Sequence, residues 1–285
     1  MANEYKICAF NKHYLAESEL PIGLQNRAFR YGDGFFETMH ANGLKTQFIA
    51  DHYQRIVKAA ATLEMHLPDY FSLDFFDKQI SGLLSRNKLF QAARVKAVFV
   101  RGGAGLYLPD KNATDIFIEA KYLGKGPYEM LHQGLVLGVY NTFSKPNVPY
   151  LQIKSLNAQF YILASLYAQR HSFDDVLLVS ADNFLIEATS SNMFAIRGNE
   201  LFTPSLKLGP VEGVMRKQIL KIASGLGFLV NDDALLMAED LHQMDEIFLT
   251  NAVSGIRSVI GFQNRRYFKK KSQMLLERLN NQAFS

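Results

Sequence analysis

The chain of 285 residues is 48% hydrophobic and 20% charged, with a formal net charge of +4, which indicates a globular protein of one large or two ordinary domains and excludes a disordered one. Cys8 is the one cysteine, so an intrachain disulfide is excluded. No apolar run is long enough to cross a membrane, the start lacks the apolar core of a secretory signal, and the basic residues are scattered, so we expect a cytoplasmic protein that binds neither membrane nor nucleic acid.

The first half of the chain predicts strands, then helices, then strands again. Asn42-Gly43 is its strongest hairpin signal, because both residue types tolerate a positive φ. Asp51 can cap or open the first helix, and Gly32 and Gly34 interrupt the alternation that precedes it. The predicted elements are hairpins over 5–18 and 34–49, helices over 51–65 and 72–89, and strands over 93–102 and 114–123.

Residues 124–133 combine glycine, proline and charge without a period, which is typical of a linker. We therefore predict a small N-terminal α+β domain over 1–123 and a larger C-terminal domain over 134–285, with largely antiparallel sheets. The elements expected in the second domain are strands over 135–140, 174–180, 184–189, 192–197, 245–251 and 256–262, and helices over 155–170, 213–227 and 270–280.

Lys154 lies where a loop meets the predicted helix that starts at about Ser155. A lysine held there in a dry pocket would be a nucleophilic amine, although a lysine in this position is more often a solvent-facing residue. Glu187 lies within an apolar strand, where an unpaired carboxylate would be costly to bury. It must therefore either face solvent from an edge strand or meet a cation, for which a protonated ring nitrogen is one candidate.

Two further places could bind an anion. The predicted helix that opens at Gly213, Val214 and Met215 has free N–H groups in its first turn, which suit a phosphate but occur at every helix start. The residues after a buried strand, 250–252, could supply donors to the same anion. Arg55 could clamp phosphate oxygens, but its spacing from Asp51 favours an ordinary surface pair. No metal-binding, nucleotide-binding or serine-hydrolase motif is present in the sequence.

Taken together, six stretches resemble the class IV aminotransferases, the fold-type IV enzymes that use pyridoxal 5′-phosphate (PLP). This family includes the branched-chain and D-amino-acid aminotransferases and aminodeoxychorismate lyase. The matching stretches are FRYGDGFFET at 29–38, DHYQRI at 51–56, IKSLN at 153–157, LIEATSSNMF at 185–194, VEGVMR at 211–216 and DEIFLTNAVSGIRSV at 245–259.

The resemblance implies a two-domain α+β fold with PLP held between the domains, and a homodimer. It implies that Lys154 forms the covalent aldimine with PLP and later moves the substrate proton, and that Glu187 pairs with the pyridine nitrogen so that the ring is a better electron sink. It also implies phosphate binding by Arg55, by the backbone of Val214 and Met215, and by Asn251 and Ala252. A lysine that acts as a base near neutral pH needs a depressed pKa.

The subgroup stays open between two activities. The stretches GDGFFET and TNAVSGIRSV look closer to the lyase and D-amino-acid branch, whereas the lyase would be expected to have an arginine in place of Leu106. We expect a 4-amino-4-deoxychorismate lyase that forms pyruvate and 4-aminobenzoate for folate, with a branched-chain or D-amino-acid aminotransferase as the alternative. A non-enzymatic binding protein on the same fold is the rival class. The candidates for substrate binding are Arg30, Phe36, Arg101, Tyr107 and Arg257.

Overall fold

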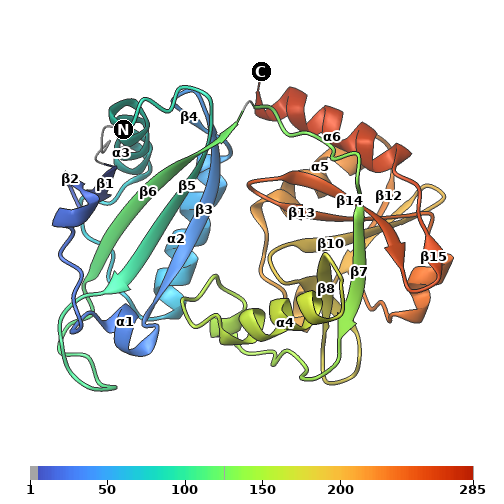
Figure 1. Cartoon of the computed structure of the whole chain (residues 1–285), viewed down its shortest axis with the longest axis horizontal. Helices are drawn as coiled ribbons and strands as arrows, with labels where there is room; N and C mark the ends of the chain where they lie inside the picture. Colours follow the sequence, from blue (N-terminus) through green and yellow to red (C-terminus); the bar gives the residue numbers. More distant parts are fainter. Residues whose placement is uncertain (1–5, 125, 285) are drawn as a thin grey trace. The chain divides into compact units, whose positions relative to one another are not determined.

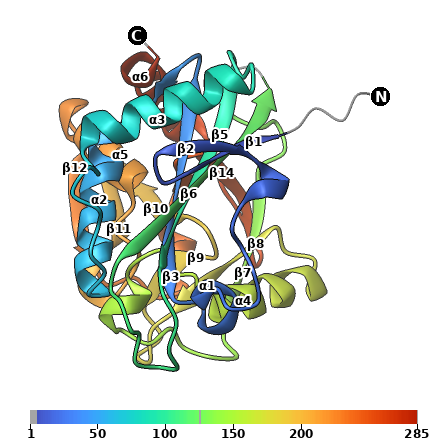
Figure 2. The same ribbon diagram turned by 90° about the vertical axis from the view of Figure 1, so that its left-hand side faces the viewer.

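A computed structural model of the chain describes residues 6–124 and 126–284. The contacts divide the chain into two units, which are drawn in Figures 1 and 2. Unit 1 runs up to Pro127 and includes Ile153–Asn157, and unit 2 consists of Tyr128–Gln152 and Ala158 onwards. The division at 127/128 falls within the predicted linker. Residues 153–157, expected within the C-terminal domain, group instead with unit 1.

Unit 1 is built on a six-stranded sheet in the order β2-β1-β6-β5-β3-β4, with every neighbouring pair antiparallel. The strands are β1 (Ile7–Phe10), β2 (His13–Ala16), β3 (Gly34–Asn42), β4 (Lys45–Thr46), β5 (Ala92–Arg101) and β6 (Thr114–Gly124). The helices are η1 (Glu17–Glu19), α1 (Arg27–Tyr31), α2 (Ile49–Thr62) and α3 (Leu73–Arg86).

Helices α2 and α3 cover one face of this sheet, as Figure 2 shows. Alternate residues of β3 and β5, among them Phe35, Met39 and Phe99, form a core with Ile56 of α2 and Ile80 of α3. The period of two in the strands and of about 3.6 in the helices brings these side chains to one interface. The pattern of apolar residues therefore predicts this layer correctly.

Unit 2 is built on a nine-stranded sheet in the order β12-β11-β10-β13-β14-β7-β8-β9, with β15 paired to β14. Its strands are β7 (Leu135–Tyr140), β8 (Asp175–Val179), β9 (Leu185–Ala188), β10 (Asn192–Arg197), β11 (Glu200–Pro204), β12 (Leu229–Ala234), β13 (Glu246–Asn251), β14 (Gly255–Phe262) and β15 (Arg265–Arg266). Its helices are η2 (Pro149–Leu151), α4 (Gln159–Arg170), η3 (Leu206–Leu208), α5 (Val214–Gly225), η4 (Glu239–Gln243) and α6 (Lys270–Ala283).

Three helices pack on this second sheet. Helix α6 lies against β13 and β14, α5 lies against β12 and β13, and α4 lies against β7 and β8. The largest core cluster contains Leu137, Leu177, Met193 and Leu249, which come from four different strands. Strands β7, β8, β10 and β13 therefore share one core.

Several details differ from the expectations. The sheet of unit 2 is mixed, because β7 pairs in parallel with both β8 and β14 and β11 pairs in parallel with β12. Helix α4 begins at Gln159, since residues 154–156 pair with a strand of unit 1. The second hairpin turns at Gly43-Leu44, one residue later than expected, because Asn42 pairs with Lys45. No helix in the described residues is long and apolar enough to span a membrane.

Candidate active site

The segment that carries Lys154 is held against strand β3 by backbone pairing. The Phe36 amide donates to the Lys154 carbonyl at 2.8 Å, and the Leu156 amide donates to the Gly34 carbonyl at 3.0 Å. Strand β4 pairs only with the far end of β3, so this start of β3 has an edge available. The side chain of Ile153 is buried in the core of unit 1 and fixes the segment further. The backbone on both sides of Lys154 is therefore tied down.

Lys154 lies over an aromatic ring that it shares with a second cation. Its Nζ is 4.7 Å from the centroid of the Phe36 ring, and the Nζ of Lys96 is 5.2 Å from the same centroid. Both lysines are half-buried, and the ring attracts them through its negative face. Two ammonium groups thus converge on Phe36, one of the predicted substrate-binding residues. Nothing in the apolar pattern of the sequence pointed to Lys96.

The two glycines that flank Asp33 have different structural causes. Gly32 ends α1 in the left-handed region, with a φ of 62°, which favours glycine. A Cβ on Gly34 would collide with the carbonyl oxygen of Phe99 and press on the Leu156 side chain. Gly34 is therefore required where β3 receives the segment of Lys154.

Asp33 lies between two buried arginines. Its carboxylate accepts from Nε of Arg27 at 2.7 Å and from Nε of Arg101 at 3.1 Å. The remaining nitrogens of Arg101 donate to the carbonyls of Leu63 and Glu64 and to Asn112. All three nitrogens of Arg101 are engaged within unit 1, so its contacts are those of a structural residue.

Arg55 lies on α2, and its guanidinium grips the carboxylate of Glu37. Its Nε donates to Oε2 at 3.1 Å, and its terminal nitrogen contacts Oε1. The Nδ1 of His52 lies 2.7 Å from Oε1, and Glu37 is only 2% exposed. Burial raises the pKa of Glu37, but the charge of Arg55 and the hydrogen bond from His52 outweigh it and bring this pKa down to about 2. Glu37 therefore orients the predicted phosphate-binding arginine.

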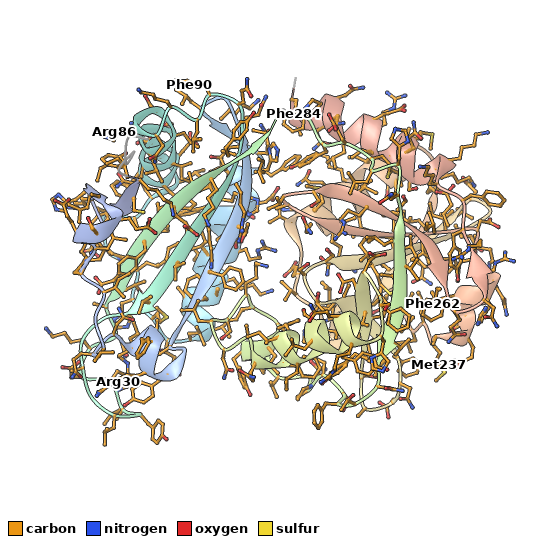
Figure 3. All side chains as sticks on the ribbon, viewed as in Figure 1. Arg30, Arg86, Phe90, Met237, Phe262 and Phe284 are labelled. Atoms are coloured by element: carbon orange, nitrogen blue, oxygen red, sulfur yellow. The ribbon has the colours of Figure 1, made fainter. Side chains whose placement is uncertain are left out.

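Two predicted substrate-binding residues lie at the surface of unit 1. Arg30, labelled in Figure 3, is exposed on α1, and Tyr107 is 89% exposed in the loop between β5 and β6. Arg27 donates to the carbonyls of Ala104, Gly105 and Leu106 and so pins this loop beside α1. Both residues therefore lie at the surface, Arg30 on α1 and Tyr107 in the loop that Arg27 holds.

Glu187 is buried on the edge strand β9 of unit 2 and is bound by three donors. Its Oε1 accepts from Nζ of Lys145 at 2.5 Å and from the Tyr161 hydroxyl at 2.9 Å, and its Oε2 accepts from the Val211 amide at 3.0 Å. Glu187 is 3% exposed, so the outward-facing alternative is wrong. A cation does meet this carboxylate, and it is Lys145, a residue that the sequence did not single out.

The loop that touches Glu187 leads directly into the predicted anion site at α5. Asn192 leaves no space for a side chain at Gly213, since a Cβ there would collide with its Oδ1, and it donates to the Val211 carbonyl at 2.8 Å. Gly213 is the N-cap of α5 and offers no side-chain cap. The first-turn N–H groups, which include those of Val214 and Met215, lack an acceptor within the helix and remain suited to an anion.

The turn after β13 lies beside the turn between β9 and β10. Asn251 donates to the Ser191 hydroxyl at 3.0 Å, and its side-chain oxygen accepts from the amides of Val253 and Ser254 at 3.0 and 2.8 Å. The Tyr128 hydroxyl donates to the Ala252 carbonyl at 3.0 Å. Asn251 and Tyr128 thus both stabilise this turn through their side chains.

Each unit therefore gathers its own share of the predicted residues. Unit 1 places Lys154 and Arg55 against the neighbouring residues Phe36 and Glu37 of β3. Unit 2 joins Glu187, the start of α5 and Asn251 through short hydrogen-bonded connections. Arg257 is half-buried on β14 opposite Leu249. Lys96, Lys145 and Tyr161 were missed, because a lone lysine or tyrosine carries no sequence signal of its partner.

The family is shown by a comparison with family models. The model described as amino-transferase class IV matches residues 34–261, which is most of the chain. The chain belongs to the class IV aminotransferase family, whose members in the comparisons are enzymes. The recognition made from the six sequence stretches is confirmed.

The relatives carry two different activities in their names. Aminodeoxychorismate lyase of Vibrio harveyi is 26% identical over 254 residues, which cover 87% of this chain and 89% of the relative. Branched-chain-amino-acid aminotransferase of Escherichia coli K12 is 25% identical over 268 residues, with coverages of 89% and 85%. The structure of the branched-chain amino acid aminotransferase from T.th. with pyridoxamine 5′-phosphate shares the fold, with a TM-score of 0.88, 20% identity and coverages of 98% and 95%.

Proposed function

We propose that the protein is a PLP-dependent enzyme that acts on a small amino compound, with 4-amino-4-deoxychorismate lyase as its activity and an amino-acid aminotransferase as the second candidate. The observation that best supports PLP as the cofactor is the polar network of unit 2. A buried carboxylate, Glu187, is bonded to the loop that opens an uncapped helix, α5. These are the two groups that a protonated pyridine nitrogen and a phosphate require.

Further features of the chain fit the cofactor. The hydroxyl oxygen of Thr250 is buried and has no hydrogen-bond partner among the described residues, and Thr250 pairs across the sheet with Asn192, whose side chain abuts Gly213. An orphaned hydroxyl is uncommon in a protein interior and suits a site that a ligand completes. Arg55, held by Glu37, keeps a planar guanidinium of the kind that binds phosphate oxygens.

The roles of the chain's own residues follow from this fit. PLP, when bound, would supply an aldehyde for the lysine amine and an electron sink for the substrate carbon. Lys154 would bind that aldehyde carbon, and its freed amine would later take the proton from the substrate α-carbon. Glu187 would hold a proton on the ring nitrogen. The first turn of α5, residues Asn251 and Ala252, and Arg55 would bind the phosphate.

Substrate recognition needs a cation near Lys154 if the substrate carries a carboxylate. Lys96 meets this need better than Arg101, because its ammonium lies over the same Phe36 ring as that of Lys154, whereas the nitrogens of Arg101 are engaged. We therefore add Lys96 to the substrate-binding proposal and retain Phe36 and Arg257. Lys96 alone does not distinguish the two activities, since substrates of both classes carry carboxylates.

The lyase is favoured by sequence features and by one relative. GDGFFET and TNAVSGIRSV are closer to the lyase and D-amino-acid branch, and the Vibrio harveyi lyase matches over 89% of its own length. The aminotransferase is kept because the Escherichia coli relative matches almost as well. The deciding experiment supplies purified protein with aminodeoxychorismate, and separately with a panel of L- and D-amino acids and oxo acids. Release of pyruvate and 4-aminobenzoate supports the lyase, and turnover that requires an oxo acid supports the aminotransferase.

We also propose a homodimer in the cytoplasm. Helix α4 presents an exposed apolar row, Ile162, Leu163 and Leu166, on a helix that follows the Lys154 segment. Such a row fits a second copy of this chain, as the family resemblance implies. Light scattering of the wild type should give twice the mass of one chain, and the Leu166→Lys variant should give the mass of a single chain. A monomeric wild type would overturn the dimer, and recovery of the native protein outside the cytoplasmic fraction would overturn the location.

A further inference from the structure

Lys145 is a buried charged residue to which the proposed function gives no task. Its side chain has no exposed surface, and its Nζ lies 2.5 Å from Oε1 of Glu187 and 2.7 Å from the Gly209 carbonyl. Its own amide donates to the Val179 carbonyl of the neighbouring strand. Burying a charge with a long flexible stem is costly unless it is paired and fixed, and both conditions are met here.

The contacts of Glu187 leave a single direction open. A carboxylate has about four lone-pair positions, two on each oxygen. Lys145 and the Tyr161 hydroxyl occupy those on Oε1, and the Val211 amide occupies one on Oε2. No donor from the described residues takes the second position on Oε2, which suits a further donor. The three protein donors therefore decide where a proton-bearing ligand can meet this carboxylate.

Lys145 is also the charged member of this set. Burial, followed by the charge of Glu187 and the hydrogen bond to it, raises the pKa of Tyr161 well above its ordinary value, so Tyr161 stays a neutral donor. The Val211 amide does not titrate. Among the described residues that bond to Glu187, Lys145 alone brings a positive charge, and it offsets part of the negative charge that a ligand would meet.

We propose that Lys145 is a positioning residue that orients the Glu187 carboxylate and offsets part of its charge, and so limits how tightly the site holds a proton on the ring nitrogen of PLP. This inference rests on the proposed function, because it concerns the same site. It assigns two lysines to two tasks: Lys154 supplies the amine that bonds to the cofactor, and Lys145 stays an ion-pair partner.

The test reads the ring nitrogen directly. Protein loaded with PLP that carries ¹⁵N in its ring is followed by NMR across the pH range in which it stays folded, for wild type, Lys145→Met and Lys145→Gln. Both variants remove the charge, and glutamine keeps a hydrogen-bond donor. We expect the pH at which the ring nitrogen loses its proton to rise by about one unit or more in both, a tenfold gain in proton affinity. Lys145→Arg, which keeps the charge, should resemble wild type.

Lys207→Met is a matched control, since Lys207 forms an exposed pair with Asp233 in the same unit. It should leave the signal unchanged. Identical ring-nitrogen signals in wild type and both neutral Lys145 variants overturn the inference while the proposed function stands. A wild type that binds no PLP overturns both.

The protein without cofactor gives an independent readout. Lys145→Met leaves Glu187 buried without its cation, so this variant should unfold at lower denaturant concentration, and adding Glu187→Gln should restore most of the loss. This rescue shows that the pair acts as a pair even where Lys145→Met loads PLP poorly. Additive losses, without rescue, contradict the inference. Borohydride reduction of the loaded Lys145→Met variant should still label Lys154, and a label that disappears with Lys145 contradicts it as well.

Discussion

Glu37→Gln is the substitution that most directly tests the proposed role of Arg55, which Glu37 orients. Glu37 is 2% exposed, and its contacts with Arg55 and His52 lower its pKa from 4.5 to about 2. A group whose pKa is depressed on folding adds stability that is present above its unfolded pKa and lost as the pH falls toward its folded pKa. The shift of the Glu37 pKa from 4.5 to about 2 corresponds to about 3 kcal/mol of unfolding free energy at neutral pH.

His52 acts in the same direction on acidification. Burial lowers the pKa of His52, only partly opposed by Glu37, so the folded protein resists its protonation and loses stability as the pH falls below 6.5. The wild type should therefore weaken steadily from neutral pH to acid. Glu37→Gln should be about 3 kcal/mol less stable at neutral pH, with a deficit that shrinks below pH 4.5, where the wild-type advantage fades.

The assay is urea unfolding of the full chain followed by circular dichroism at several pH values. Glu17→Gln is the matched control, because Glu17 is an exposed carboxylate paired with Lys6, and it should change stability by less than about 0.5 kcal/mol. The same Glu37→Gln variant should weaken PLP binding about tenfold, since Arg55 loses the negative charge and one of the two acceptor oxygens that orient it. A deficit at neutral pH below about 1 kcal/mol, or one that grows on acidification, refutes the reasoning.

Three further substitutions test the arrangement around Lys154 and the phosphate site. Gly34→Ala should cost about 1–3 kcal/mol of stability and displace the lysine segment, seen as slower cofactor attachment, because its Cβ meets the Phe99 carbonyl; Gly23→Ala, in open space, should do neither. Lys96→Met should raise KM by a factor at least ten times the factor by which kcat falls, and a KM equal to that of the wild type would contradict its role. Tyr128→Phe should weaken PLP binding several-fold through the loss of about 1 kcal/mol from the Ala252 turn, and unchanged affinity would rule out this anchor.

The elements were largely readable from the sequence because local and global preferences agree. The helix expected from residue 72 is α3, which Ser72 caps by accepting from the Phe75 amide, and the strands of unit 1 follow their apolar alternation. Helix α4 begins later than expected because pairing with β3 takes precedence over helix propensity near Lys154. That pairing joins residues far apart in the sequence, so the local pattern of apolar residues cannot predict it.

The site was readable only in part, for a similar reason. Six stretches in order identified the family, and the resemblance made Lys154 and Glu187 candidate site residues. The partner of Glu187 could not, since Lys145 lies 42 residues earlier in an irregular loop and meets the carboxylate only through the fold. Arg101 was a candidate for substrate binding from the sequence, whereas in the structure its nitrogens donate to Asp33, Asn112 and two backbone carbonyls.

The central claim is that Lys154 bonds to PLP. Purified protein mixed with PLP should develop a yellow absorbance band at one cofactor per chain, and borohydride reduction followed by peptide mapping should locate the label on Lys154. Lys154→Ala should lose the label, whereas the surface variant Lys121→Ala should keep it. A colourless wild type would favour the binding-protein class, and a label that persists in Lys154→Ala would contradict the assignment outright.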